Sequence, residues 1–160
     1  MDAYDEAQIC GNGHLITSMA KSLPQFQSKF CKDCGCKAIN NCIKCDSKIK
    51  GHYSTDSLSI RAFVVPLFCD ECGSPYPWTT SKLSSAAELV ELSNSLNLKE
   101  LEEFNINLEA IVMRSPNTVV AQSKIKRQLS KLGGEVVNGL KEILIGVISK
   151  TISMSIFGAK

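Results

Sequence analysis

The sequence lacks the motifs that identify the common classes of enzyme. Its 160 residues include two histidines and one tryptophan, and it contains no serine-hydrolase, P-loop, dinucleotide-binding or zinc-protease motif. No uncharged apolar run approaches the roughly 18 residues that a membrane-spanning helix needs. The opening stretch, "MDAYDEAQIC", carries neither the basic nor the apolar segment of a secretory signal. We therefore expect a non-enzymatic protein of the cytoplasm.

Cysteine is absent from the second half of the chain, and all eight cysteines lie between Cys10 and Cys72. In a reducing compartment such cysteines are metal ligands more often than disulfides. Beyond Trp78 the composition turns to Leu, Glu, Ser, Lys and Ile with helical spacing. This contrast predicts an α+β protein with a small β-rich zinc-ribbon head over residues 1–80 and a helical region over residues 81–160.

Potential metal ligands occur in four close pairs. They are Cys10 with His14, Cys31 with Cys34, Cys42 with Cys45, and Cys69 with Cys72. A C-x-x-C turn places two sulfurs on one side of a tight knuckle, and zinc binds four such ligands in a tetrahedron. The pairs therefore predict two Zn²⁺ sites, one with three cysteines and a histidine and one with four cysteines. Both would be closed structural sites, because neither leaves a position for a reactive water.

Other uses of these cysteines fit the pattern less well. An iron–sulfur cluster takes the same thiolates but rarely a histidine, and a redox pair needs only one C-x-x-C. The grouping of the pairs stays open between sequential order and a cross-brace that joins the first pair to the third. We favour sequential order, since it needs only short local connections. Cys36 and His52 have no partner at knuckle spacing, so we interpret them as a free thiol and a strand side chain.

Four segments, "QICGNGHLI", "KFCKDCG", "INNCIKCDSKIKGHY" and "LFCDECGSPYPWT", carry a resemblance that covers nearly the whole chain. In this order they resemble an uncharacterised family of bacterial zinc-ribbon proteins, a domain of unknown function. The resemblance implies that the four pairs are the family's metal ligands, and Cys36 does not match its pattern. The resemblance does not indicate any particular activity, because none is established for the family.

Two further features of the head carry expectations. The segment "GHYSTDSLSIRAFVVPLFC" has two β-prone runs around a polar turn, which predicts a hairpin between two knuckles. The Pro-Tyr-Pro-Trp cluster that follows ends in Trp78. We expect this side chain to pin the ribbon to the first helix. The alternative is a recognition surface for a peptide or a base.

The second half predicts a series of helices. A first helix follows Thr79, a second lies in "NLKELEEFNINLEAIVM", a third begins at Pro116, and a last one runs from Glu135 to about Phe157. Residues 83–113 are acidic and residues 114–131 are basic. Opposite charges on consecutive helices favour pairing of the two helices, either as an antiparallel hairpin or between two chains.

The last predicted helix is apolar over more than half of its circumference, so it has to bury against something. Our leading hypothesis is a zinc-binding adaptor or scaffold that self-associates, or binds a helical protein partner, through residues 135–157. One alternative is a protein that inserts this amphipathic helix into a membrane surface. Another is nucleic-acid binding by the ribbons with Lys124, Lys126, Arg127 and Lys131, although a formal net charge of +2 gives no strong basic field.

Overall fold

The computed structural model describes residues 3–54 and 62–158. The chain divides into two compact units, Met1–Thr80 and Ser81–Lys160. The first contains small antiparallel sheets and the second contains helices, which confirms the predicted α+β class. We call the first unit the head and the second the helical unit.

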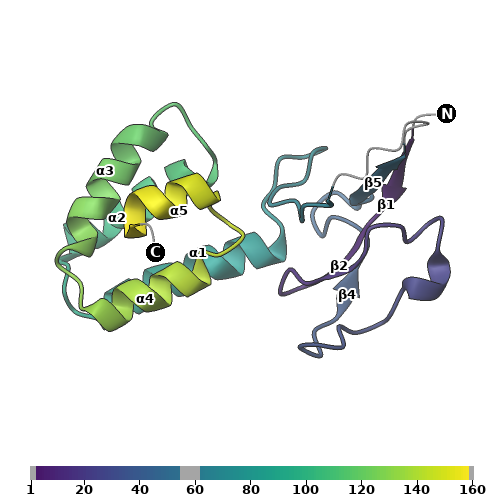
Figure 1. Ribbon diagram of the computed structural model, residues 1–160, viewed down its shortest axis with the longest axis horizontal. Helices are drawn as coiled ribbons and strands as arrows, with labels where there is room; N and C mark the ends of the chain where they lie inside the picture. Colours follow the sequence, from purple (N-terminus) through teal and green to yellow (C-terminus); the bar gives the residue numbers. More distant parts are fainter. Residues whose placement is uncertain (1–2, 55–61, 159–160) are drawn as a thin grey trace. The chain divides into compact units, whose positions relative to one another are not determined.

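The described residues of the head form two small sheets (Figure 1). In one, β1 (Ala3–Glu6) pairs with β5 (Lys50–Ser54), and in the other β2 (Gln8–Cys10) lies between β3 (Leu15–Thr17) and β4 (Ala38–Ile39). A short 3₁₀ helix, Pro24–Phe26, lies between β3 and β4 in sequence. All three strand pairings are antiparallel, as is usual for sheets with one solvated face.

The predicted hairpin between the knuckles is wrong in the part of it that the structure describes. Its first run forms β5, but the partner of β5 is β1, near the start of the chain. Residues 62–67 form no strand, and the predicted turn at residues 55–61 lies outside the described residues. The β1–β5 pairing depends on Gly51, because a Cβ there would lie 2.2 Å from the Ser18 carbonyl oxygen. The chain therefore passes too close for any side chain.

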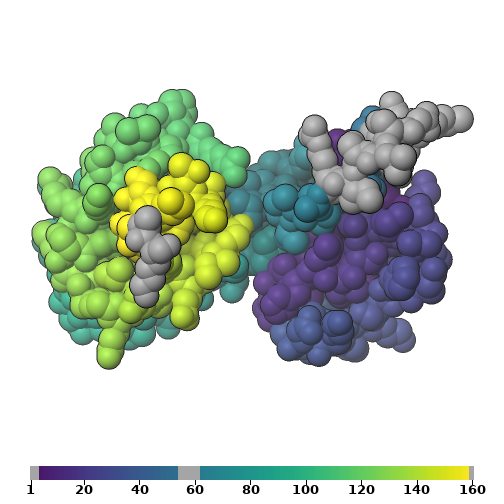
Figure 2. All heavy atoms as spheres, in the orientation of Figure 1, coloured from purple at the N-terminus to yellow at the C-terminus, as the bar shows by residue number. Residues whose placement is uncertain are grey.

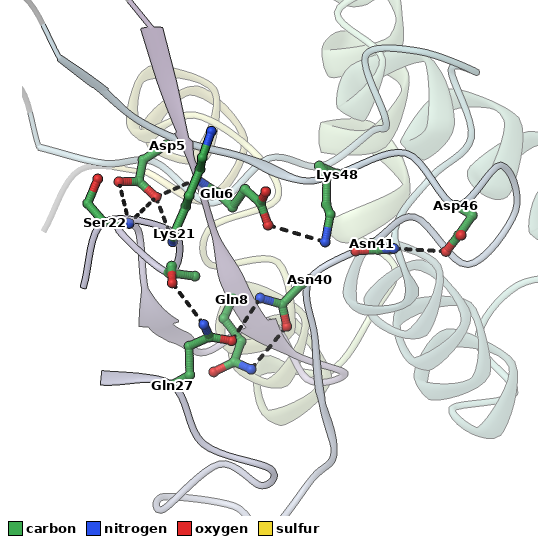
Figure 3. A network of polar contacts seen from close by, with 11 residues as sticks. Asp5, Glu6, Gln8, Lys21, Ser22, Gln27, Asn40, Asn41, Asp46 and Lys48 are labelled. Atoms are coloured by element: carbon green, nitrogen blue, oxygen red, sulfur yellow. Dashed lines mark hydrogen bonds and ion pairs between the residues drawn. The ribbon is translucent and has the colours of Figure 1, made fainter. Parts of the chain in front are cut away.

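Hydrogen bonds hold the segment that follows β3 against the strands (Figure 3). Buried Asp5 accepts from the N–H groups of Lys21 and Ser22, at 2.9 and 3.2 Å. Buried Gln8 donates its amide to Asn40 Oδ1 at 3.0 Å. These polar contacts order a stretch of the head that has few apolar side chains to bury.

The second half of the chain contains five helices among the described residues. They are α1 (Pro77–Leu92), α2 (Leu98–Val112), α3 (Thr118–Leu129), α4 (Gly134–Ile143) and α5 (Lys150–Phe157). Asn97 and Glu100 form a capping box that begins α2. The third helix begins at Thr118, two residues beyond the expected start.

Helices α2 and α3 form the antiparallel pair that the charge pattern predicts. Glu103 of α2 forms an ion pair with Lys124 of α3 at 3.1 Å, and Glu100 forms one with Lys131 just beyond α3. The start of one helix thus meets the end of the other. Surface pairs of this kind add little stability, so packing decides the arrangement.

The single last helix predicted over residues 135–157 is wrong, because the structure has two helices there. The chain turns after Ile143, and Gly146 adopts a left-handed conformation with φ of 80°. Ser149 then begins α5, since its Oγ accepts the Ile152 N–H at 3.3 Å. Gly146 is thus a turn glycine, and Ser149 is a helix cap.

The core of the helical unit is a cluster of aliphatic and aromatic side chains. Its buried members are Ala86, Val90, Leu96, Phe104, Leu108, Ile111, Ala121, Ile125, Leu129, Leu132, Leu140, Leu144 and Ile156. Figure 2 shows α5, in yellow, lying against the green atoms of the preceding helices of the same unit. Among the described residues, no helix combines the length and apolarity needed to cross a membrane. Residues 135–157, which we call the tail, contribute Leu140, Leu144 and Ile156 to this buried cluster.

Candidate metal centres

Three short turns in the head share one backbone geometry. In each C-x-x-C knuckle, the N–H of the first cysteine donates to the carbonyl oxygen of the residue five positions later, at 2.8 Å. The donors are Cys31, Cys42 and Cys69, and the acceptors are Cys36, Ser47 and Ser74. The residue after the second cysteine is left-handed in every knuckle, with φ of 68° at Gly35, 60° at Asp46 and 69° at Gly73. The repeated turn aims both sulfurs of a knuckle to one side.

The pair Cys10 and His14, the first along the chain, forms a similar turn that is one residue longer. The Cys10 N–H donates to the His14 carbonyl oxygen at 3.0 Å, and Gly13 takes the left-handed conformation with φ of 85°. The His14 N–H lies 3.3 Å from Cys10 Sγ and donates to it. With this extra residue, the His14 imidazole is the second ligand of its turn, whereas the second ligand of each C-x-x-C knuckle is a sulfur.

The first and second turns bring Cys10, His14, Cys31 and Cys34 together, with all ligand atoms within 4.8 Å of one another. Cys10 Sγ lies 3.7 Å from Cys34 Sγ. His14 Nδ1 lies 3.3 Å from Cys34 Sγ and 3.6 Å from Cys31 Sγ. Zinc–sulfur bonds of about 2.3 Å in a tetrahedron place sulfurs about 3.8 Å apart, and a sulfur and a nitrogen about 3.6 Å apart. The group therefore fits a tetrahedral metal ion, and we call it site 1.

The third and fourth turns form an equivalent group of four cysteines, which we call site 2. Its members are Cys42, Cys45, Cys69 and Cys72, again with all sulfurs within 4.8 Å. Cys42 Sγ lies 3.8 Å from Cys72 Sγ, and Cys45 Sγ lies 3.7 Å from Cys69 Sγ. These separations match a tetrahedron of thiolates around one ion. The structure thus has the sequential grouping and not the cross-brace.

Both sites follow the same pattern of burial. The first cysteine of each pair is buried (Cys10, Cys31, Cys42 and Cys69), whereas the second ligand is exposed. All eight cysteines are free of disulfides. Each site therefore lies at the edge of the head, with its inner sulfurs in the core and its outer donors facing solvent.

Hydrogen bonds favour the thiolate form at several of these cysteines, and the thiolate is the form that binds metal. The Ser47 hydroxyl outweighs burial and, with neighbouring peptide N–H groups, lowers the pKa of Cys69 to about 6. The Ser74 hydroxyl lowers the pKa of Cys72, and the Cys36 N–H lowers that of Cys34. Burial raises the pKa of Cys10. A bound cation would reverse this last effect.

The two aromatic side chains of the Pro-Tyr-Pro-Trp cluster pack inside the head. Tyr76 and Trp78 are 2% and 3% exposed and stack with ring centroids 4.7 Å apart. Trp78 Nε1 donates to the Pro66 carbonyl oxygen at 2.8 Å. A Cβ at Gly13, in the first turn, would lie 2.9 Å from the Trp78 Cβ. Trp78 therefore supports the knuckles from within, at the start of α1, and offers no ring face for recognition.

Cys36 and His52 lie outside both groups, as the spacing predicts. Cys36 Sγ would be 2.8 Å from a Cβ at Gly11, so the thiol packs beside the first turn. His52 belongs to β5, where its N–H donates to the Ser18 carbonyl oxygen at 2.7 Å. The residues that sequence reasoning missed are Ser47 and Ser74. The sequence does mark these two serines, because both lie at the last position of a C-x-x-C-x-S pattern.

Several lysines that could have formed a basic surface are paired with acids. Lys124 and Lys131 pair with Glu103 and Glu100 in the helical unit. In the head, Lys50 pairs with Asp70 at 2.5 Å. Each of these three cations therefore has an acidic side chain beside it that offsets part of its charge.

Two groups of four cysteine and histidine donors, held on knuckles in a small β-rich head, define a protein with two candidate metal sites. The chain belongs to the family described as "Uncharacterized protein conserved in bacteria (DUF2321)", whose model matches residues 3–156. This confirms the family resemblance carried by the knuckle segments. Comparisons with curated proteins and with solved structures each found no match.

Proposed function

We propose that the protein is a non-enzymatic, zinc-binding adaptor whose head is folded by two structural Zn²⁺ ions. The observation that carries this proposal is the pair of four-donor groups, with sulfur–sulfur distances of 3.7 to 3.8 Å. Thiolates with one imidazole, in a tetrahedron, are the donors that structural zinc prefers. Cys10, His14, Cys31 and Cys34 would hold one ion, and Cys42, Cys45, Cys69 and Cys72 the other.

The chemistry of the two sites supports a structural role. Four protein donors complete a tetrahedral shell, so no coordination position is left for substrate or for a water that zinc would activate. A bound ion would neutralise part of the thiolate charge and hold the knuckles together. On this proposal the protein functions by binding partners at its surface and not by catalysis.

We further propose that the chain self-associates through its tail, residues 135–157. Two large apolar side chains of this segment remain at the surface: Ile145 is 64% exposed and Met154 is 48% exposed. Their neighbours Leu144 and Ile156 are buried. Accessible apolar side chains beside buried ones support contact with a second copy of the chain.

Native mass spectrometry of the purified full-length protein tests both parts of the proposal. We expect two zinc ions per chain and a mass that is a multiple of the chain mass. The double variant Ile145→Ser/Met154→Ser should keep both ions and become monomeric. Leu92→Ser is the matched control, because Leu92 is 70% exposed but lies outside the tail. Fewer than two ions would overturn the zinc assignment, and a monomeric wild type would overturn self-association alone.

A further inference from the structure

The residue five positions after the first cysteine has the same place in all three C-x-x-C knuckles. Its carbonyl oxygen accepts the N–H of that cysteine at 2.8 Å in each case. Site 2 has serine at this position in both of its knuckles, Ser47 and Ser74, whereas the one C-x-x-C knuckle of site 1 has Cys36. One backbone position therefore carries a hydroxyl donor at site 2, whereas beside site 1 it carries a thiol that packs against Gly11.

Ser47 contacts sulfurs from both knuckles of site 2. Its Oγ lies 3.0 Å from Cys45 Sγ, on its own knuckle, and 3.3 Å from Cys69 Sγ, on the other. Ser74 Oγ lies near one sulfur of the site, 3.4 Å from Cys72 Sγ. When the cysteines bind metal as thiolates they have no proton to donate, so the serine hydroxyl is the donor. Ser47 thus links the two halves of the site.

The charge of the two sites explains why a hydroxyl matters more at site 2. Four thiolates around Zn²⁺ give a net charge of −2, whereas three thiolates and a neutral imidazole give −1. Hydrogen bonds to charged acceptors are stronger than those between neutral groups. The more negative site gains more from each donor that reaches its sulfurs.

We propose that Ser47 is a positioning residue of site 2, whose hydroxyl shares its single proton between the Cys45 and Cys69 thiolates and slows release of the metal. This inference rests on the proposed zinc occupancy. It assigns Ser47 to the shell of groups that orients the ligands of a metal without touching the metal itself. Ser74 has the same role with a smaller effect, because its hydroxyl reaches one sulfur of the site.

The test is the rate at which the full-length, zinc-loaded protein loses metal to a chromogenic chelator. Alkylation of released thiols, read by peptide mass spectrometry, assigns each loss to site 1 or site 2. For Ser47→Ala we expect release from site 2 to be about 10- to 100-fold faster, and release from site 1 to be unchanged. Ser47→Thr keeps the hydroxyl and should restore slow release.

The reciprocal variant Cys36→Ser places a hydroxyl at the same position beside site 1. Release from site 1 should then slow, with site 2 unchanged. If Ser47→Ala releases metal at the wild-type rate, or if Ser47→Thr fails to restore it, Ser47 is not a positioning residue. A wild type that binds fewer than two zinc ions is a different outcome, because it overturns the proposed function on which the inference rests.

Discussion

The head and the helical unit are equal in length, yet their cores have different compositions. The helical unit buries a large cluster in which leucine, isoleucine and phenylalanine fill the space between helices. The head buries a small cluster, Ala7, Ile9, Ile49, Tyr76 and Trp78, together with Cys42 and Cys69 of site 2. Two of its core positions are thus occupied by candidate metal ligands.

The two units therefore obtain their free energy of folding from different sources. Burial of apolar side chains contributes about 1.5–3 kcal/mol each, which a helical core of this size supplies many times over. The head has few such side chains, and natural small scaffolds whose core is this limited add a structural metal or disulfides. Metal binding and folding should therefore be coupled in the head and independent in the helical unit.

The largest effect that we predict is that of metal removal. Chelation of both ions should unfold the head, because structural zinc contributes about 10 kcal/mol or more per site. The helical unit should stay folded, since its core contains no metal ligand. Amide NMR spectra of the full-length protein measure this directly. Signals of the head should lose their dispersion, while those of the helical unit keep theirs.

Re-addition of zinc provides the control for this experiment and should restore the head signals. The comparison between the units breaks down if the head keeps its dispersion without metal. It also breaks down if the helices melt together with the head.

Substitution of Leu140 should affect the helical unit alone. Leu140 is fully buried in the helical cluster, so Leu140→Ala should lower the free energy of unfolding by about 2–5 kcal/mol. Zinc content should not change. Chemical denaturation followed by far-ultraviolet circular dichroism measures the loss. Ile145→Ala is the matched control, because Ile145 is 64% exposed, and an equal loss there would contradict the assigned core.

Substitution of Gly51 should affect the head alone. A Cβ at this position meets the backbone of Ser18 and Glu6, so Gly51→Ala should destabilise the β1–β5 sheet by about 1–3 kcal/mol. Gly134→Ala, in the helical unit, meets nothing within 4 Å and should be tolerated. Hydrogen exchange of the β1 and β5 amides reports the effect. Unchanged protection in Gly51→Ala would show that the strands are not packed as described.

The smallest predicted effect concerns Asp5. Burial alone would raise the pKa of its carboxyl group, but hydrogen bonds from Ser22 and from the peptide N–H groups of Glu6 and Lys21 outweigh it and lower the pKa. A lowered pKa means that the stabilisation is complete above the unfolded-state pKa, and is lost only as the pH falls through the lowered folded-state value.

Asp5→Asn should accordingly cost about 0.5–1.5 kcal/mol. The difference from the wild type should be constant between about pH 5 and pH 8, since the carboxylate stays ionised throughout. Thermal unfolding of the zinc-loaded protein across this range checks it. A difference that grows as the pH falls toward 5 would mean that the Asp5 pKa is raised in the folded protein and not lowered.

Local spacing made the knuckles predictable from the sequence. A C-x-x-C turn is specified by adjacent residues, so the four pairs could be identified without knowledge of the fold. Their grouping could only be favoured, because it depends on which turns meet in space. The pairing of β1 with β5 left no local signal at all, since it joins segments more than 40 residues apart in sequence.

The error in the tail has a different cause. Gly146 and Ser149 interrupt an apolar pattern that continues on both sides, so periodicity alone favoured one long helix. A glycine in the left-handed conformation followed by a serine cap is also the signature of a helix end and a new start. Ser47 was overlooked because it is not a ligand, and its role depends on a contact with the distant Cys69.

X-ray absorption at the zinc edge is the measurement that tests the central claim, two closed zinc sites in the head, most directly. The account predicts a first shell that contains only sulfur and nitrogen. One ion should have three sulfurs and one imidazole nitrogen, and the other should have four sulfurs. The bond lengths should be about 2.3 Å to sulfur and about 2.0–2.1 Å to nitrogen. A shell with oxygen ligands, or with fewer sulfurs, would contradict it, because at least one of the two groups would then not close around its metal.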